Sequence, residues 1–406
     1  MKKFTKLSLV AAVAVAGLSS ANAKPLEEAI KDVEVSGSVV YRYDEKDNSK
    51  APTNQTKADN NYKIGLNLSS KVNDYVKFNS RFIVGGADSG FAGGGLDTSS
   101  ANDQNVEVTL SHAYFALTAI PNTTVNVGKQ GLATPWTVAN DINGNEQTGT
   151  GVLALSNVGP VTLAAGYFNQ TNLDKSGDHP LKNSTAPLIT YDIGTKDIAT
   201  VAAIANIVDV AQVEAWYLTM QDQFDTYTLA ATSKLDLAEN AKIGLEARYV
   251  NLELDNKNVL GITGDAKKND MFRLAVDGKV GIVNARIAYT NTGKHGGLTA
   301  LDNDAKNTSL GWNLSSNSIQ DAEYLQLALG ADILENLNFT AHYGSLESKE
   351  SAANTERSEI YGQLTYKMSK NLTTYVRYGQ NEVKTKSTGV KTVDQDRGRI
   401  QVAYTF

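Results

Sequence analysis

The sequence contains no cysteine and only seven prolines in 406 residues. Without cysteine, no disulfide framework can stabilise the folded chain and no thiol chemistry is available. Because proline interrupts strand pairing, its scarcity leaves extended segments intact, while 33 glycines suit loops and close strand approach. The composition therefore favours strands that are held together by non-covalent contacts.

The chain also has little in the way of long apolar runs. The clearest run, Leu7 to Leu18, follows a lysine-rich start and precedes the small residues Ala21 to Ala23. These three parts are typical of a cleaved secretory signal peptide. An anchoring helix is the weaker interpretation, because a spanning helix needs about 20 apolar residues. We expect residues 1–23 to be removed and residues 24–406 to form one exported domain.

Charge and histidine content disfavour two further classes of function. The formal net charge is −6, and removal of the three lysines of the signal leaves −9, which argues against nucleic acid as a partner. The four histidines, His112, His179, His295 and His342, are scattered and have no recognisable serine or carboxylate partner. Hydrolytic enzymes of the serine-histidine type need such a partner. We therefore expect no enzymatic activity.

The feature that is abundant is alternation of apolar and polar residues over strand lengths. In the segment Arg397 to Phe406, Ile400, Val402, Tyr404 and Phe406 share one face. Side chains of a strand point alternately to opposite faces, so one face suits lipid and the other suits water. Similar segments recur along the chain, and we count eighteen. The pattern predicts an all-β fold, a transmembrane antiparallel barrel of about eighteen strands.

The connections between these segments alternate in length. Eight are short turns such as Asn73 to Asp74, and between them lie longer polar stretches such as Asp44 to Asn60 and Lys294 to Asp321. This alternation is typical of an up-and-down barrel in the bacterial outer membrane, with short periplasmic turns and long external loops. Apolar residues are nearly continuous around Ala203, and the connection at 221–224 is very short. Sixteen strands is therefore an alternative.

Arginine is absent from the loops. The chain has nine arginines, and all fall on strands, on the face opposite the apolar residues: Arg42, Arg81, Arg248, Arg273, Arg286, Arg357, Arg377, Arg397 and Arg399. A lipid-facing arginine would cost about 2–4 kcal/mol at the membrane midplane. Tolerance of arginine on any wet surface does not explain why the polar loops have none. We interpret the nine as lining a pore, because eighteen strands leave a channel too wide for side chains to fill.

An open pore needs a constriction to be selective, and the segment Gly131 to Gly149 is our candidate. It carries Trp136 as an anchor, followed by a turn-rich tip with Asp141 and Glu146. Carboxylates that face an arginine wall would set an electric field across the pore. Salt screens charges beyond about 8 Å, so the field acts most strongly on ions where the pore is narrowest. This hypothesis predicts a preference for cations. The alternative is an ordinary solvated external loop, which we also expect for Asp302-Asn303-Asp304.

The final aromatic residues suggest a role in assembly. Tyr404 and Phe406 lie on the same face of the final segment and give it an aromatic, alternating end. We interpret this end as the signal that the barrel-assembly machinery of the outer membrane recognises.

Several segments carry a family resemblance. Pro25 to Gly37 and Tyr41 to Asp44 resemble the mature amino terminus of the major outer membrane porin family of Campylobacter and its relatives, and Gly128 to Gln130, Pro135 to Thr137 and Thr162 to Ala165 resemble its third-loop region. The resemblance covers the whole chain in layout. It implies an eighteen-stranded homotrimer that prefers cations and holds a divalent cation, Ca²⁺, in the lumen near the constriction. Asp141 is the one ligand that the motif carries over.

The sequence thus predicts an outer-membrane porin, a water-filled channel for passive diffusion of ions and small hydrophilic solutes. Two alternatives remain. The first is a substrate-specific channel of similar strand number, and the second is a structural or adhesive surface protein whose barrel is plugged.

Overall fold

The computed structural model describes residues 33–52, 56–86, 90–92, 107–176, 193–208, 210–349 and 354–406. The predicted signal peptide at 1–23 and the first part of the resembling segment, up to residue 32, lie outside these ranges. The domain boundary at 23/24 therefore stays a prediction.

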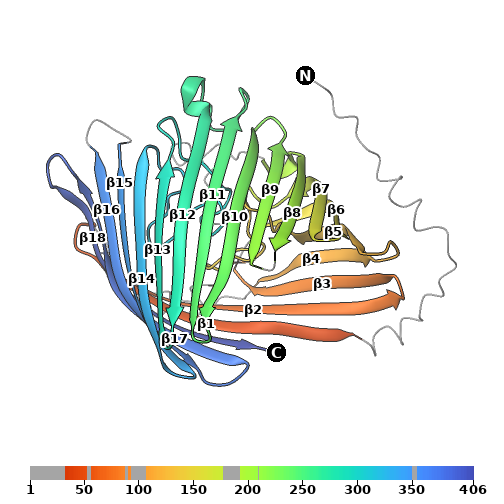
Figure 1. Cartoon of the computed structure of the whole chain (residues 1–406), viewed down its shortest axis with the longest axis horizontal. Coiled ribbons are helices and arrows are strands. Elements are labelled where there is room, and N and C mark those ends of the chain that lie inside the picture. Colours follow the sequence, from red (N-terminus) through yellow and green to blue (C-terminus); the bar gives the residue numbers. More distant parts are fainter. Residues whose placement is uncertain are drawn as a thin grey trace.

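Eighteen antiparallel strands form one closed sheet (Figure 1). Each strand pairs with its neighbours in sequence, and the ladder between β1 and β18 closes the ring. The strands are β1 (Glu34–Asn48), β2 (Thr56–Asn73), β3 (Val76–Gly85), β4 (Glu107–Leu117), β5 (Thr123–Gly131), β6 (Thr148–Val158), β7 (Val161–Thr171), β8 (Ile198–Val208), β9 (Ala211–Met220), β10 (Phe224–Ala238), β11 (Ala241–Leu254), β12 (Lys268–Val280), β13 (Val283–Thr292), β14 (Ala322–Leu334), β15 (Leu337–Ser348), β16 (Thr355–Lys367), β17 (Leu372–Thr385) and β18 (Lys391–Thr405).

The predicted count of eighteen strands is confirmed, and sixteen is excluded. The two doubtful regions are regular: β8 pairs with β9 along its length, and a tight turn at 221–223 joins β9 to β10. In this turn Asp222 has a positive φ of 59°, a conformation that aspartate tolerates better than most residues. The brevity of the connection reflects a tight hairpin and not a missing strand.

Several strands are longer than the apolar alternation predicted. The segment from Asp44 to Asn60 was expected to be a loop, but β1 continues to Asn48 and β2 begins at Thr56. The register between them runs on to Asp47 opposite Thr56. Ladder hydrogen bonds form wherever two strands stay side by side, so pairing continues into polar residues that carry no apolar pattern. The polar stretch that was expected to be a loop is therefore largely strand.

The outer face of the barrel is apolar. In β10, Tyr227 and Leu229 are 40% and 53% exposed, while the alternating residues Thr226 and Thr228 are buried. Exposed leucine, isoleucine, valine and aromatic side chains occupy equivalent positions on the other strands. Such a band suits contact with lipid. Within the described residues, no helix is long and apolar enough to cross a membrane.

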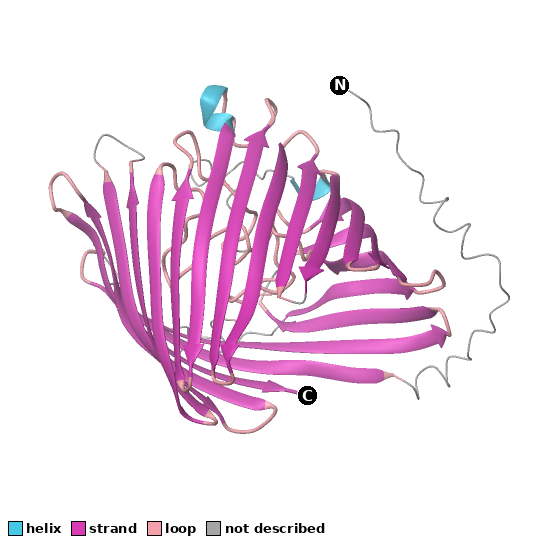
Figure 2. Ribbon diagram, in the orientation of Figure 1, coloured by secondary structure: helices cyan, strands magenta, loops and turns pink. Residues whose placement is uncertain are grey.

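Two of the long connections fold back against the inner face of the wall. We name them the β5–β6 loop (residues 132–147) and the β13–β14 loop (residues 293–321); Figure 2 shows the connections in pink among the strands. They bind each other, because Leu301 N donates to Trp136 O at 2.8 Å and Gln147 Nε2 donates to Leu301 O at 2.8 Å. Trp136, Leu301 and inward apolar residues of β7 to β11 form one buried cluster. The core thus lies inside the barrel.

The predicted assembly signal lies at the seam of the ring. Phe406 exchanges two backbone hydrogen bonds with Gly37 of β1, at 2.9 and 3.1 Å. A Cβ at Gly37 would lie 2.6 Å from the Phe406 ring, so glycine permits this approach. The rings of Tyr404 and Phe406 stack on the exposed face. Recognition by assembly machinery stays a prediction.

Candidate functional site

The nine arginines project from the face opposite the apolar band. Arg273 is 8% exposed, whereas its neighbours Phe272 and Leu274 are 41% and 47% exposed. The same alternation holds around Arg377, which lies between the exposed residues Val376 and Tyr378. The wall therefore places guanidinium groups inside the barrel, where the two inserted loops meet them.

The β5–β6 loop is fastened to the wall through Glu146, which is 0% exposed. Its carboxylate lies 2.8 Å from Lys63 Nζ of β2 and 2.8 Å from Arg81 of β3, and Ser111 of β4 donates a further hydrogen bond. Burial alone would raise the pKa of Glu146, but the hydrogen bond from Arg81 and the charges of Lys63 and Arg81 outweigh burial and hold the pKa below its usual value. Glu146 is therefore an ionised anchor and not a carboxylate open to the lumen.

The other two predicted constriction residues also have defined positions. Trp136 is 0% exposed in the inner apolar cluster, as its predicted role as an anchor requires. Asp141 is 5% exposed and accepts hydrogen bonds from the backbone and side chain of Asn145, both at 2.7 Å. It orders the loop tip. Next to it, Ile142 O accepts a hydrogen bond from Arg42 at 2.8 Å.

The β13–β14 loop is also attached to the wall through a carboxylate, but here the carboxylate belongs to the wall and not to the loop. Glu359 of β16 is 3% exposed and accepts hydrogen bonds from Trp312 N at 3.0 Å and from Asn313 N at 2.7 Å. A Cβ at Gly311 would lie 1.6 Å from Glu359 Oε1, so the close approach requires glycine there. In the described part of the chain Glu359 forms no ion pair.

The side chain of Trp312, in the same loop, packs against arginines of β17 and β18. The guanidinium groups of Arg377, Arg397 and Arg399 lie 5.1, 5.0 and 5.8 Å from centroids of its ring system. Arg397 also donates to Asn313 Oδ1 at 2.6 Å. Cation–π contacts of this kind are favourable when they are shielded from water. The loop tip is thus held both by its backbone and by its aromatic side chain.

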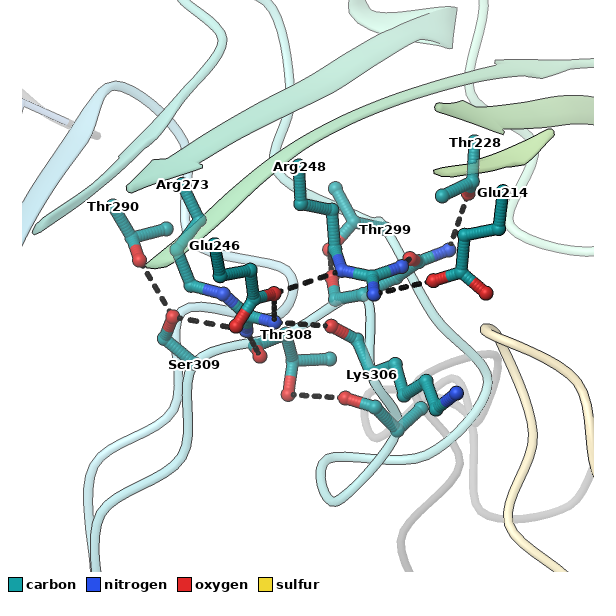
Figure 3. A network of polar contacts seen from close by, with 12 residues as sticks. Glu214, Thr228, Glu246, Arg248, Arg273, Thr290, Thr299, Lys306, Thr308 and Ser309 are labelled. Carbon is teal, nitrogen blue, oxygen red and sulfur yellow. Dashed lines mark hydrogen bonds and ion pairs between the residues drawn. The ribbon is translucent and has the colours of Figure 1, made fainter. Parts of the chain in front are cut away.

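A third group of contacts holds the middle of the β13–β14 loop against β11 and β12 (Figure 3). Arg248 binds Glu214 at 2.6 Å and Glu246 at 3.1 Å, and Arg273 binds Glu246 at 2.6 Å. Arg273 also donates to Thr308 O and to Lys306 O, both in the loop. These arginines therefore have carboxylate partners on the wall and carbonyl partners on the loop.

The remaining predicted arginines differ in their partners. Arg286 binds Asp277 at 2.6 Å, Arg399 and Arg397 approach Asp44 at 2.6 and 3.6 Å, and Arg357 donates to Ser348 Oγ at 2.8 Å. Among the described residues, Arg42 and Arg377 have no carboxylate within 4.0 Å and bind the amides of Gln401 and Gln363 instead. Their positive charges are less compensated than those of the arginines that bind a carboxylate.

One sequence expectation is wrong. Asp302-Asn303-Asp304 was expected to be a solvated loop tip, but Asp302 is 0% exposed. The stretch bonds to the other inserted loop, because Asp304 Oδ2 accepts a hydrogen bond from Ile142 N at 2.9 Å. Within the stretch, Asp302 Oδ1 accepts a hydrogen bond from Asp304 N at 2.8 Å, and local sequence does not reveal which residues of the fold will cover it.

The described residues do not by themselves form a metal site. Among them no group of three or more acidic, histidine or cysteine side chains is arranged to hold an ion. Ca²⁺ takes six to eight oxygen ligands, and Asp141 already accepts two hydrogen bonds from Asn145. Asp141 as a ligand for the calcium that the resemblance implies stays a prediction.

Two cavities between the loops and the wall contain several charged side chains. The basic cavity, about 300 Å³, is lined by Arg42, Lys63, Arg81 and Arg377 of the wall and by loop residues that include Asp141. The mixed cavity, about 340 Å³, is lined by cations and carboxylates together: Arg273, Arg286, Lys306, Asp304 and Glu359. Polar hollows between an inward-folded loop and a charged wall are the arrangement that a selective pore uses.

Comparison with known proteins agrees with this geometry. The sequence model of the Campylobacter major outer membrane protein family matches residues 1–406. The chain belongs to this family. Like other members, the chain is an outer-membrane β-barrel, and the predicted localisation is confirmed. No curated protein matches the chain in sequence.

Solved outer-membrane channels share the fold of this chain. OpdL of Pseudomonas aeruginosa has a TM-score of 0.73 at 16% identity, OccK1 (OpdK) of the same organism 0.72 at 14%, and OccAB3 of Acinetobacter baumannii 0.72 at 15%. In each case the match covers 93% of this chain and 99% of the other. At such low identity the likeness establishes the eighteen-stranded architecture alone.

Sequence reasoning missed the partners that give the inner residues their geometry. Lys63, Ser111, Glu359 and Trp312 were not singled out, although Lys63 and Glu359 lie on inward positions of predicted strands. A charged residue on an inner face signals a partner across the lumen, but the sequence does not say which loop supplies it.

Proposed function

We propose that the protein is a porin, a passive channel that admits ions and small hydrophilic solutes through the outer membrane. The observation that carries the proposal is the polar inner wall with two loops folded against it and cavities of about 300 and 340 Å³ between them. A barrel of eighteen strands is too wide for side chains alone to fill. Inserted loops narrow such a lumen without closing it.

Planar-bilayer recording of the purified protein tests this proposal. We expect stable open steps with a conductance that rises in proportion to salt concentration, because solute would cross through water and not through a saturable site. Small steps that saturate with one solute would favour the substrate-specific channel. If properly folded protein gave no steps, the channel proposal would be wrong and the plugged, adhesive barrel would take its place.

The ion preference is a separate part of the proposal. Cation preference was predicted from Asp141 and Glu146, and it stays a prediction. The pairing of Glu146 with both Lys63 and Arg81 weighs against it, because the negative charge of Glu146 is compensated by two positive charges. Asp141 is then the loop carboxylate on which the preference depends. The reversal potential under a salt gradient, compared between wild type and Asp141→Asn, decides the sign and the role of this residue.

A further inference from the structure

We propose that the basic cavity is a binding site for small organic carboxylates. The proposal rests on the channel function above and adds a class of solute that is held on its way through the lumen. It is built on residues that the structure describes: Arg42, Arg377 and Tyr375 on the wall, and the loop tip at 140–144 opposite them.

The charges around the cavity do not balance. Four cationic side chains line it, Arg42, Lys63, Arg81 and Arg377, with one carboxylate, Asp141. Glu146, behind Lys63 and Arg81, supplies a second negative charge. Asp304, which accepts a hydrogen bond from the lining residue Ile142, supplies a third, so four positive charges less three negative charges leave an excess of one. An anion that enters the cavity therefore meets a positive field inside low-dielectric walls, where electrostatic attraction is stronger than in bulk water.

Two guanidinium groups have hydrogen-bond donors left over. Arg377 uses Nε–H for Gln363 Oε1 at 2.7 Å, and its terminal amino groups make no hydrogen bond to the described residues. Arg42 uses Nε–H for Gln401 Oε1 and one terminal amino group for Ile142 O, which leaves the other. A guanidinium has five N–H donors and binds carboxylates through two parallel hydrogen bonds. Both groups are held in place and can still bind an anion.

Their orientation is fixed by neighbours. Gln401 Oε1 accepts hydrogen bonds from Arg42 Nε and from the Tyr375 hydroxyl, at 2.8 and 3.1 Å. The guanidinium carbon of Arg42 lies 4.3 Å from the centroid of the Phe91 ring, and that of Arg377 lies 5.3 Å from the centroid of the Tyr375 ring. Donors that are already ordered lose little entropy on binding, so such a site is preorganised.

Size and lining favour an organic anion over an inorganic one. The cavity has a volume of about 300 Å³, and Val40, Phe91 and Ile142 contribute apolar surface beside the guanidinium groups. This is the lower end of the range in which small-molecule sites fall. Phosphate would use the charges but leave most of the volume to water, whereas a short-chain carboxylate places carbon against the apolar residues.

The mixed cavity provides a matched control. Arg286 lies there, but Asp277 binds it at 2.6 Å and Glu246 lies 3.7 Å away. Arg286→Gln and Arg377→Gln therefore remove the same charge from the same inner face, in the compensated cavity and in the uncompensated one. If the site is local, only Arg377→Gln weakens anion binding. If the lumen charge acts as a whole, both variants weaken it equally.

Calorimetric titration of glutarate into the purified full-length protein in detergent tests the proposal, with inorganic phosphate as the second probe. We expect saturable binding of glutarate that weakens about tenfold in Arg377→Gln, the effect of losing one charge-assisted pair. Arg42→Gln should weaken it to a similar extent, and Arg286→Gln should leave it unchanged within about twofold. Phosphate should bind more weakly than glutarate. The heat-resistant electrophoretic mobility of the barrel confirms that each variant is folded, and Arg377→Gln keeps the test valid if Arg42→Gln does not fold.

Each contrary result has a defined meaning. Absence of glutarate binding, or equal weakening in Arg377→Gln and Arg286→Gln, would overturn the site. Phosphate binding as tightly as glutarate would overturn the assignment to organic carboxylates. Because calorimetry needs no ion flow, a protein that conducts but does not bind refutes the site alone, and one that binds but does not conduct refutes the channel function alone.

Discussion

Glu146 and Glu359 each attach a loop to the inner wall, but Glu146 belongs to the loop and Glu359 belongs to the wall. Glu146 is part of the β5–β6 loop and reaches two cations of the wall, Lys63 and Arg81. Glu359 is part of the wall and reaches two backbone N–H groups of the β13–β14 loop. The first contact joins full charges, and the second joins a charge to dipoles. The same residue type therefore serves two attachments that should respond differently to substitution and to pH.

The difference follows from what each site offers a buried carboxylate. An ionised group inside a protein needs either an opposite charge or several hydrogen bonds. The strands near Glu146 supply lysine, arginine and serine side chains, so the loop can contribute a single residue. Near Glu359 the loop supplies Trp312 N and Asn313 N, which Gly311 allows to come close. These backbone donors do not depend on a charged side chain of the loop, so on the loop side the second attachment is sensitive to substitution of Gly311 and to proline.

The strongest test of the comparison is Glu146→Gln. It leaves Lys63 and Arg81 buried without their anion, and loss of one partner of a buried pair costs about 3–5 kcal/mol. We expect a loss of this size in the free energy of unfolding, measured by urea denaturation in detergent. The double variant Lys63→Met, Glu146→Gln should recover part of it, because one unpaired cation is gone. A single variant as stable as the wild type would contradict the role of Glu146 as an anchor.

Acid should reproduce that effect. The pKa of Glu146 is held below its ordinary value of 4.5, so its contribution to stability is complete above 4.5 and is lost as the pH falls through the lowered pKa. A protonated carboxyl, like the glutamine amide, is neutral and keeps one accepting oxygen, so we expect a loss similar to that in the variant. We expect the unfolding midpoint to fall with pH in this acidic range. The Glu146→Gln variant should lack this component of the pH dependence.

Glu359→Gln should have a smaller effect. The amide retains one oxygen for Trp312 N or Asn313 N and leaves no charge unpaired, so we expect a loss of about 1–3 kcal/mol in the free energy of unfolding. Proteolysis by an added protease should show whether the tip at 310–315 becomes accessible while the β5–β6 loop stays protected. A loss equal to that of Glu146→Gln would mean that the two attachments are energetically alike.

The wall could be predicted from the sequence because its signal is local. A strand repeats every two residues, so Ile400 and Val402 indicate a face without knowledge of any partner. The same periodicity placed all nine arginines on the inner face. Strand ends were predicted less well, since Asp47 and Thr56 extend β1 and β2 through pairing alone.

The interior could be predicted only in part. The anchor Trp136 was recognisable as an aromatic residue beside proline, and the β5–β6 loop was identified by its length and its carboxylates. The β13–β14 loop was not, because its polar sequence is also typical of a solvated loop. Its contacts, such as Arg273 with Thr308, join residues far apart in the chain, and no local pattern records them.

The ladder between β1 and β18 has a consequence for the order of folding. Its register runs from Ser38 opposite Thr405 to Asn48 opposite Gln395, so it joins the strands most distant in sequence, whereas every other ladder joins consecutive strands. Hairpins of neighbouring strands can form early, but loop-closure entropy delays the contact of longest range. Closure of this seam should be the last and slowest step, and every intermediate before it has two unpaired edges that can aggregate unless they are shielded.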